Sequence, residues 1–109
     1  MADPGRNHMI KHIALFKFKS GVSKEQREEL FGRALRLPEE VPGVMEFEIH
    51  RDILGTPQSY DLGLVASFRD MDSLLKYGDH PERVGAGNFA QELCESIIIF
   101  DYDTARESR

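Results

Sequence analysis

The sequence predicts an α+β domain with the element order β-α-β-β-α-β and a four-stranded antiparallel sheet, the split βαβ arrangement. Two observations carry this topology. Two apolar stretches with strand character, 9–19 and 95–103, stand near the two ends of the chain. A helical apolar repeat follows the first stretch and another precedes the second, with two alternating runs between them. The length of 109 residues fits one domain, expected at 9–103 between tails at 1–8 and 104–109, the first of them disordered.

The first expected strand, 9–19, is apolar on both faces at its centre. Successive strand side chains point to opposite faces, so the residues separate into two sets. One set is His12, Ala14, Phe16 and Phe18, and the other is Met9, Ile13 and Leu15, with three lysines near the strand ends.

A helix is expected after the turn at Ser20 and Gly21. Ser23 and Gln26 have the spacing of a capping box. Pro38 is expected to end the helix, since proline removes a backbone donor. Between them, apolar side chains recur at helical spacing, namely Leu30, Phe31, Ala34, Leu35 and Leu37.

The second half of the chain repeats the pattern. Strands are expected at 44–53 and 60–68, where apolar residues alternate with other side chains. Asp70 then caps a short helix that runs through Tyr77. The pair His80-Pro81 starts a further helix, because proline is favoured at the first helical position.

Helices on one face of such a sheet leave the other face open. The set with His12, Phe16 and Phe18 is expected to face the helices, because the helical stripe needs an aromatic surface to pack on. The open face then exposes a large apolar patch, which a second copy of the chain should cover as a homodimer. The residues assigned to this patch are Ile13, Leu15, Val65, Ile97 and Ile99.

The composition excludes several classes of partner. A net charge of −5 argues against a nucleic-acid or anionic-membrane surface, and no apolar run approaches a membrane span. The single cysteine, Cys94, indicates a reducing, cytoplasmic compartment and a buried structural role. The histidines lack metal-ligand spacing and no phosphate-binding glycine motif is present, so we expect neither a metal nor a cofactor.

Several segments resemble the stress-responsive A/B barrel (Dabb) family. They are the opening MIKHIALFKFKSGVSKEQ, the turn VPGV, the segments YDLGLVASF and HPERVGAGNF, and the ending ESIIIFDYD. The resemblance covers nearly the whole expected domain. It implies a ferredoxin-like protomer that pairs into a dimeric α+β barrel, with stress-linked expression.

One characterised branch of that family is a plant polyketide cyclase, which closes a ring by intramolecular aldol condensation. The resemblance matches its strand-one histidine to His12 and its tyrosine before the His-Pro motif to Tyr77. The cyclase has an HPxH pattern, whereas this chain reads HPER and places Arg83 at the position of the base. An arginine stays protonated and is suited to binding a carboxylate. Two further polar positions of that pocket are Ala34 and Leu62 here.

Each candidate residue also has a structural interpretation. His12 fits a hydrogen-bonded core histidine, and His80 fits a helix-entry residue fixed by Pro81. Tyr77 fits a packed aromatic side chain with its hydroxyl at a rim. Arg83 fits an ion pair with a neighbouring carboxylate such as Glu82 or Asp79.

Three functions stay open on this basis. The first is a dimer that binds a small, mostly apolar ligand with an acidic or carbonyl end, with or without catalysis. The second is a polyketide-cyclase-like or other lyase in which His12 and Tyr77 are catalytic. The third, by fold analogy alone, is a cofactor-independent monooxygenase. The expected ligand-binding residues are His12, Phe16, Ala34, Leu62, Tyr77, His80 and Arg83.

Overall fold

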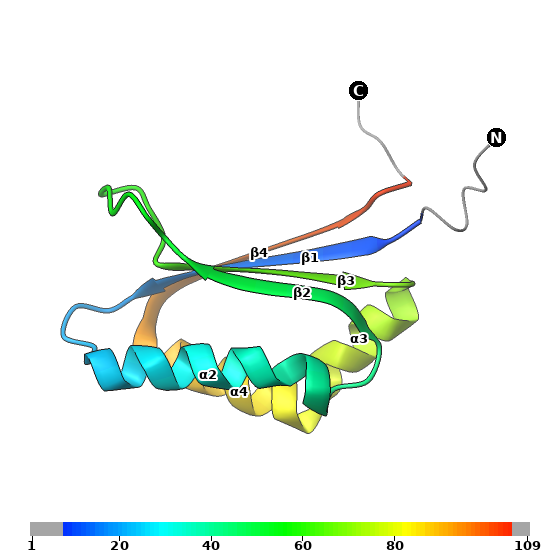
Figure 1. Ribbon diagram of the computed structural model, residues 1–109, viewed down its shortest axis with the longest axis horizontal. Coiled ribbons are helices and arrows are strands. Elements are labelled where there is room, and N and C mark those ends of the chain that lie inside the picture. The colour runs from blue at the N-terminus through cyan, green and yellow to red at the C-terminus, as the bar shows by residue number, and fades with distance from the viewer. Residues whose placement is uncertain (1–7, 106–109) are drawn as a thin grey trace.

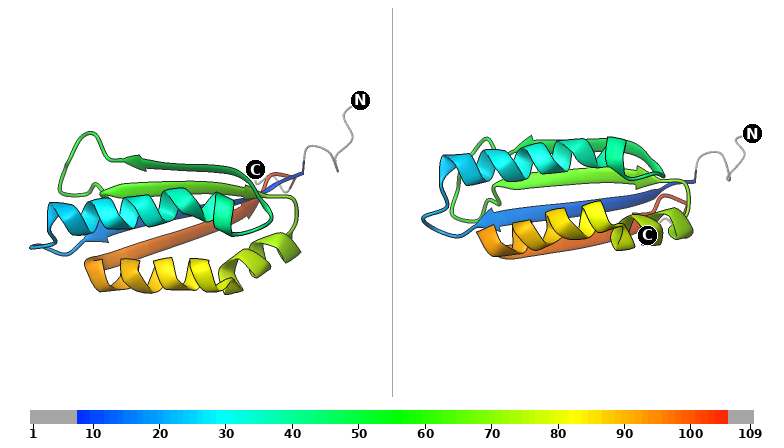
Figure 2. Two further views of the ribbon diagram at one scale, coloured as in Figure 1. Left: turned by 60° about the horizontal axis from the view of Figure 1, so that its bottom comes forward. Right: turned by 90° about the horizontal axis from the view of Figure 1, so that it is seen from below.

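The computed structural model describes residues 8–105, which form an antiparallel sheet of order β2-β3-β1-β4 covered by helices on one face (Figure 1). This arrangement confirms the predicted split βαβ topology. Figure 2 shows α2 lying beside the row formed by α3 and α4. The elements are β1 (Ile10–Phe18), α2 (Lys24–Glu40), β2 (Val44–Arg51), β3 (Leu62–Phe68), α3 (Met71–Asp79), α4 (Pro81–Leu93) and β4 (Cys94–Asp103).

The first helix begins as predicted and ends later than predicted. Gln26 donates its backbone N–H to Ser23 Oγ at 3.1 Å, and the Ser23 N–H donates to Gln26 Oε1 at 3.0 Å, so the capping box is present. The prediction that Pro38 ends the helix is wrong, because α2 continues to Glu40. Proline removes only its own backbone donor, and Val41 still donates its N–H to the carbonyl of Leu37 at 2.8 Å.

Replacing Ser23 by alanine is expected to lower the free energy of unfolding by about 1 kcal/mol, because it removes the N-cap acceptor. Urea unfolding followed by circular dichroism measures the change. Ser20→Ala serves as the control, since Ser20 lies in the preceding turn outside the cap. Equal stability of the wild type and the Ser23 variant would show that water replaces the capping hydroxyl without cost.

The two later helices begin at side-chain caps. Asp70 accepts the backbone N–H of Ser73 at 2.9 Å. His80 caps α4, its Nδ1 accepting the N–H of Glu82 at 3.2 Å, and Pro81 is the first residue of the helix. His80 therefore has the structural role that its position before proline allowed.

The strand boundaries differ slightly from those expected. The third strand begins at Leu62 rather than Tyr60. Tyr60 and Asp61 bond outside the ladder: the Tyr60 hydroxyl lies 2.8 Å from Ser96 Oγ, and Asp61 Oδ2 accepts the Phe18 N–H at 2.8 Å. These two residues thus attach the end of the β2–β3 loop to the last residue of β1 and the beginning of β4.

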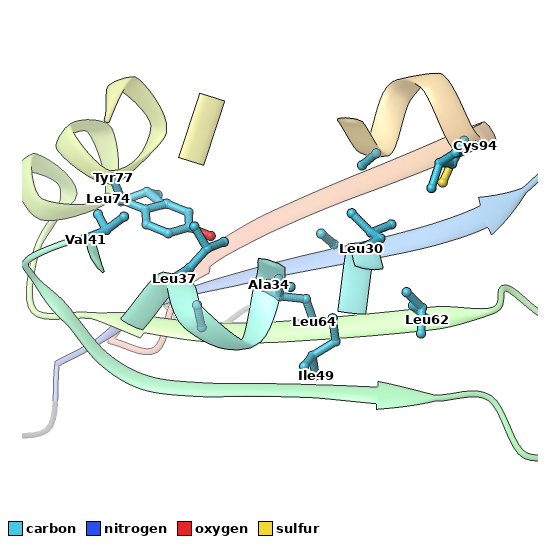
Figure 3. Packing of buried hydrophobic residues seen from close by; sticks show 14 of the residues in the cluster. Leu30, Ala34, Leu37, Val41, Ile49, Leu62, Leu64, Leu74, Tyr77 and Cys94 are labelled. Atoms are coloured by element: carbon cyan, nitrogen blue, oxygen red, sulfur yellow. The ribbon is translucent and has the colours of Figure 1, made fainter. Parts of the chain in front are cut away.

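The core lies between the sheet and the helices, as expected from the first strand. Ala14 and Phe18 are buried together with His12, which confirms that their set faces the helices. Leu30, Ala34 and Leu37 project from α2 toward the same space (Figure 3).

One part of the predicted open face is wrong. Ile97 and Ile99 lie on the helix side of β4, because Ile99 is paired with Ala14 and Ile97 with Phe16 across the β1–β4 register. Their neighbours Ile98 and Phe100 lie on the open face and are 44% and 57% exposed. The reason is that residues 97–100 are all apolar, so alternation separates two sets without showing which one faces the helices. Ile13, Leu15 and Val65 share the open face, as the register shows.

A polar cluster lies on the open face beside this apolar patch. Lys11 Nζ donates to Ser67 Oγ at 2.8 Å and to Glu46 Oε1 at 3.0 Å, and the Ser67 hydroxyl donates to the same Glu46 oxygen at 2.8 Å. The hydrogen bond from Lys11 makes the largest contribution to lowering the pKa of Glu46, and the hydrogen bond from Ser67 makes the next largest. The open face is therefore apolar around Ile13, Leu15, Ile98 and Phe100 and polar between Lys11 of β1 and Glu46 of β2.

The ends of the described chain are attached to the sheet. His8 Nδ1 lies 2.8 Å from Asp103 Oδ1, and the Met9 N–H donates to Thr104 Oγ1 at 2.9 Å. The remaining positions of the expected tails, 1–7 and 106–109, lie outside the described residues.

Candidate functional site

A cavity of about 460 Å³ lies between the helices and the sheet. Its walls come from β1, β3, β4 and all three helices and are mostly apolar, with Leu30, Leu37, Ile97 and Ile99 among them. Five of the seven predicted ligand-binding residues line it. They are His12, Phe16, Ala34, Tyr77 and Arg83.

The other two predicted residues do not line this cavity. Leu62 is buried in the core at the start of β3, and the strand contributes Leu64 to the cavity instead. The side chain of His80 faces the first turn of α4, whose Glu82 N–H it accepts. Leu64 has the same strand parity as Leu62, so alternation identified the face and not the depth along the strand.

His12 is held by an aspartate from the neighbouring strand. Its side chain is buried, and Nδ1 lies 2.5 Å from Asp101 Oδ1 across a directly paired position of β1 and β4. Within residues 8–105, every buried side-chain nitrogen or oxygen has a partner, and the hydrogen bond of His12 is made at Nδ1. The free Nε2 therefore keeps access to the cavity, which His12 lines.

Tyr77 closes the cavity at the end of α3. Its ring packs against Phe68 at a centroid distance of 5.0 Å and edge-on against His12 at 5.9 Å. Burial raises the pKa of the Tyr77 phenol, and the Arg83 guanidinium partly offsets this rise. The phenol consequently stays protonated at neutral pH and can donate a hydrogen bond. In Figure 3 the ring lies beside Leu37 with its oxygen directed inward.

Arg83 brings a positive charge to the same end of the cavity. Its guanidinium carbon lies 5.8 Å from the centre of the Tyr77 ring. The ion pair expected with Glu82 or Asp79 is absent: no ion pair within residues 8–105 includes Arg83. An arginine without a carboxylate partner is available to an anionic ligand.

The arrangement therefore joins three polar functions inside apolar walls. Nε2 of His12 accepts a proton or hydrogen bond when the aspartate holds the Nδ1–H tautomer. Tyr77 donates a hydrogen bond and Arg83 supplies charge. Sequence reasoning missed Asp101, although it shares strand parity with Ile97 and Ile99 and is the first polar residue of that set after them. Assigning those isoleucines to the helix side would have revealed it.

Cys94 also lines the cavity, and its environment makes it unreactive. Burial, with a smaller contribution from Asp61, raises the pKa of the Cys94 thiol to about 11. The thiolate is therefore scarce at neutral pH, in keeping with the structural role predicted for this residue.

Residues 8–105 contain neither a cluster of metal-ligating side chains nor a membrane-spanning helix. No group of three or more histidine, cysteine, aspartate or glutamate side chains is arranged to hold a metal ion. Nor does this part of the chain contain a helix with the length and apolar character needed to cross a membrane.

Known proteins share this fold and sequence pattern. Olivetolic acid cyclase of Cannabis sativa is 26% identical over 95 residues, which cover 85% of this chain and 94% of the cyclase. A dimeric protein of unknown function and ferredoxin-like fold from Bacteroides fragilis is 27% identical, with a TM-score of 0.74 over 87% of this chain and 95% of its own. A hydroxynitrile lyase from Passiflora edulis shares the fold, with a TM-score of 0.79 at 17% identity over 87% of this chain and 92% of the lyase.

The family assignment rests on the greater part of the chain. Residues 10–104, from the first strand to the end of the last, match the family model of the stress responsive A/B barrel domain. The chain belongs to the stress responsive A/B barrel domain family.

Proposed function

We propose that the cavity binds a small, mostly apolar compound with a carboxylate or carbonyl end. The observation that carries this proposal is the grouping of His12, Tyr77 and Arg83 in a cavity whose other walls are mainly apolar. Small-molecule sites commonly have this composition, with few polar groups that fix the orientation of the ligand. Arg83 receives the carboxylate or carbonyl oxygen, and the apolar walls receive the remainder.

We infer a second function for the same site, proton transfer of the lyase or cyclase kind. The His12–Asp101 pair favours it, because an aspartate that accepts from Nδ1 of a buried histidine fixes the tautomer in which Nε2 is a base. A carbonyl oxygen beside Tyr77 and Arg83 would be stabilised as negative charge develops on it. Arg83 cannot be the base, so proton abstraction falls to His12.

We further propose that the protein is a homodimer in a reducing, cytoplasmic compartment and is stress-responsive. The open face formed by Ile13, Leu15, Val65, Ile98 and Phe100 supports the dimer, and so does the dimeric state of the relative from Bacteroides fragilis. The buried, unpaired Cys94 supports the compartment. Stress-linked expression rests on the family alone.

Arg83→Ala is expected to weaken binding of hexanoate by about 1.5–3 kcal/mol, the range for a hydrogen bond to a charged group. Hexanoate is the probe because it joins a carboxylate to an apolar chain that fits the cavity. Isothermal titration calorimetry measures the dissociation constant. Arg36→Ala is the matched control, since Arg36 lies on α2 outside the cavity lining and interacts with Glu40 at 3.9 Å.

Two results would count against the binding proposal. If hexanoate and related short-chain acids all fail to bind the wild type, the cavity is structural. Equal binding by the wild type and the Arg83 variant would place the carboxylate elsewhere.

A further inference from the structure

Helix α4 carries two glycines near the cavity, and their surroundings differ. A Cβ atom at Gly85 would meet no atom within 4 Å. A Cβ atom at Gly87 would lie 3.6 Å from Cζ of Arg83, an ordinary contact. It would lie only 2.5 Å from Nη1 of Arg83, which is shorter than real contacts of a Cβ atom. Glycine is unfavourable inside a helix. At position 87, unlike position 85, the absence of a side chain leaves room that a neighbouring side chain uses.

That space is occupied by the guanidinium of Arg83. Residues four apart lie on the same helix face, and Arg83 extends along α4 so that its tip covers Gly87. On its other side the guanidinium carbon is 5.8 Å from the Tyr77 ring. The charged group is thus held between a backbone that lacks a side chain and an aromatic ring, and both Arg83 and Gly87 line the cavity.

The charge held there is not neutralised by the cavity lining. Glu95 is the carboxylate among the lining residues, and it follows the C-terminal end of α4. From Arg83, α4 continues for ten residues to Leu93, roughly 15 Å along the helix axis, before the chain reaches Glu95. The Arg83 end of the cavity therefore keeps an unpaired cation next to a hydrogen-bond donor, Tyr77.

We propose that Gly87 determines the specificity of this cavity: by leaving room for the Arg83 guanidinium, it makes the cavity select carboxylic acids over neutral compounds of the same shape. This inference rests on the proposed binding function and names its substrate class. Gly87 is a positioning residue, since it acts on the ligand through Arg83. Any side chain at position 87 displaces the guanidinium while the apolar walls stay in place.

The test compares Gly87→Ala with Gly85→Ala, using hexanoate and hexanamide as probes of equal length. Both variants add one methyl group to the same helix. Gly87→Ala is expected to weaken hexanoate binding about tenfold while hexanamide binding changes less than about twofold, because a charge-assisted hydrogen bond is lost and the walls are kept. Gly85→Ala is expected to leave both dissociation constants unchanged. Gly87→Val enlarges the displacement and should reduce the preference for the acid further.

Crystal structures of the two alanine variants provide a readout that needs no ligand. Arg83 should leave the Tyr77 ring in Gly87→Ala and keep its place in Gly85→Ala. An unmoved guanidinium, or a preference for hexanoate retained in both Gly87 variants, overturns the inference. If the guanidinium moves as expected but the wild type binds neither probe, the positioning by Gly87 stands, and both the proposed binding function and the acid selectivity are overturned.

Discussion

Ile98→Asp is expected to convert the protein from a dimer into a 12.4 kDa monomer. Ile98 lies on the open face of the sheet, opposite Leu15 in the β1–β4 register, and is 44% exposed in the protomer. A second copy seated on this face would bury the new carboxylate among apolar side chains, and removing a charge from water in this way is costly. Light scattering at micromolar concentration measures the mass directly.

The control for this experiment is Leu35→Asp. Leu35 is 52% exposed, but it lies on α2, on the helix side of the molecule. The same change of charge there should leave the dimer intact, which separates an interface effect from a general loss of stability. A wild type that is already monomeric, or an Ile98 variant that stays dimeric, would show that the open face is not the interface.

The sequence allowed the fold to be predicted because its local signals are strong and independent. The capping box of Ser23 and Gln26 marks the start of α2, and His80-Pro81 marks the start of α4. His12 among apolar residues shows which face of β1 is buried, because that face also carries the aromatic side chains. Each signal depends on neighbours within a few positions, so none needed the tertiary structure to be read.

The candidate site was only partly predictable, because it depends on strand register and side-chain direction. Nothing in the run from Ile97 to Phe100 distinguishes one strand face from the other, so the pairing of Asp101 with His12 stayed hidden. The direction of Arg83 was equally hidden. In the sequence, the adjacent Glu82 suggests an ion pair with Arg83. In the structure, Gly87 has no side chain, so the Arg83 guanidinium can lie along the helix instead.

The strongest expected effect on chemistry is that of Asp101→Asn. An ionised Asp101 can only accept, so a neutral His12 beside it carries its proton on Nδ1 and presents Nε2 as a base. An asparagine amide can donate to Nδ1 instead, which moves the proton to Nε2 and removes the base while the side-chain volume is kept. Nitrogen NMR of the histidine ring should report this change of tautomer.

The accompanying rate measurement needs no knowledge of the natural substrate. Exchange of the α-protons of methyl butyl ketone with heavy water, followed by NMR, reports proton abstraction in the cavity. His12→Gln is expected to slow the enzyme-dependent exchange roughly 10²–10⁴-fold, the usual contribution of a general base, and Asp101→Asn should approach that limit.

Asp103→Asn is the matched control for both measurements, because Asp103 lies on the same strand and contacts His8 rather than His12. It should leave the His12 tautomer and the exchange rate unchanged. If the wild type exchanges no faster than His12→Gln, the proton-transfer function is wrong and the cavity only binds. If the tautomer changes in Asp101→Asn without a loss of rate, the base is a group other than Nε2 of His12. Loss of rate together with the change of tautomer is the outcome that the His12–Asp101 geometry predicts.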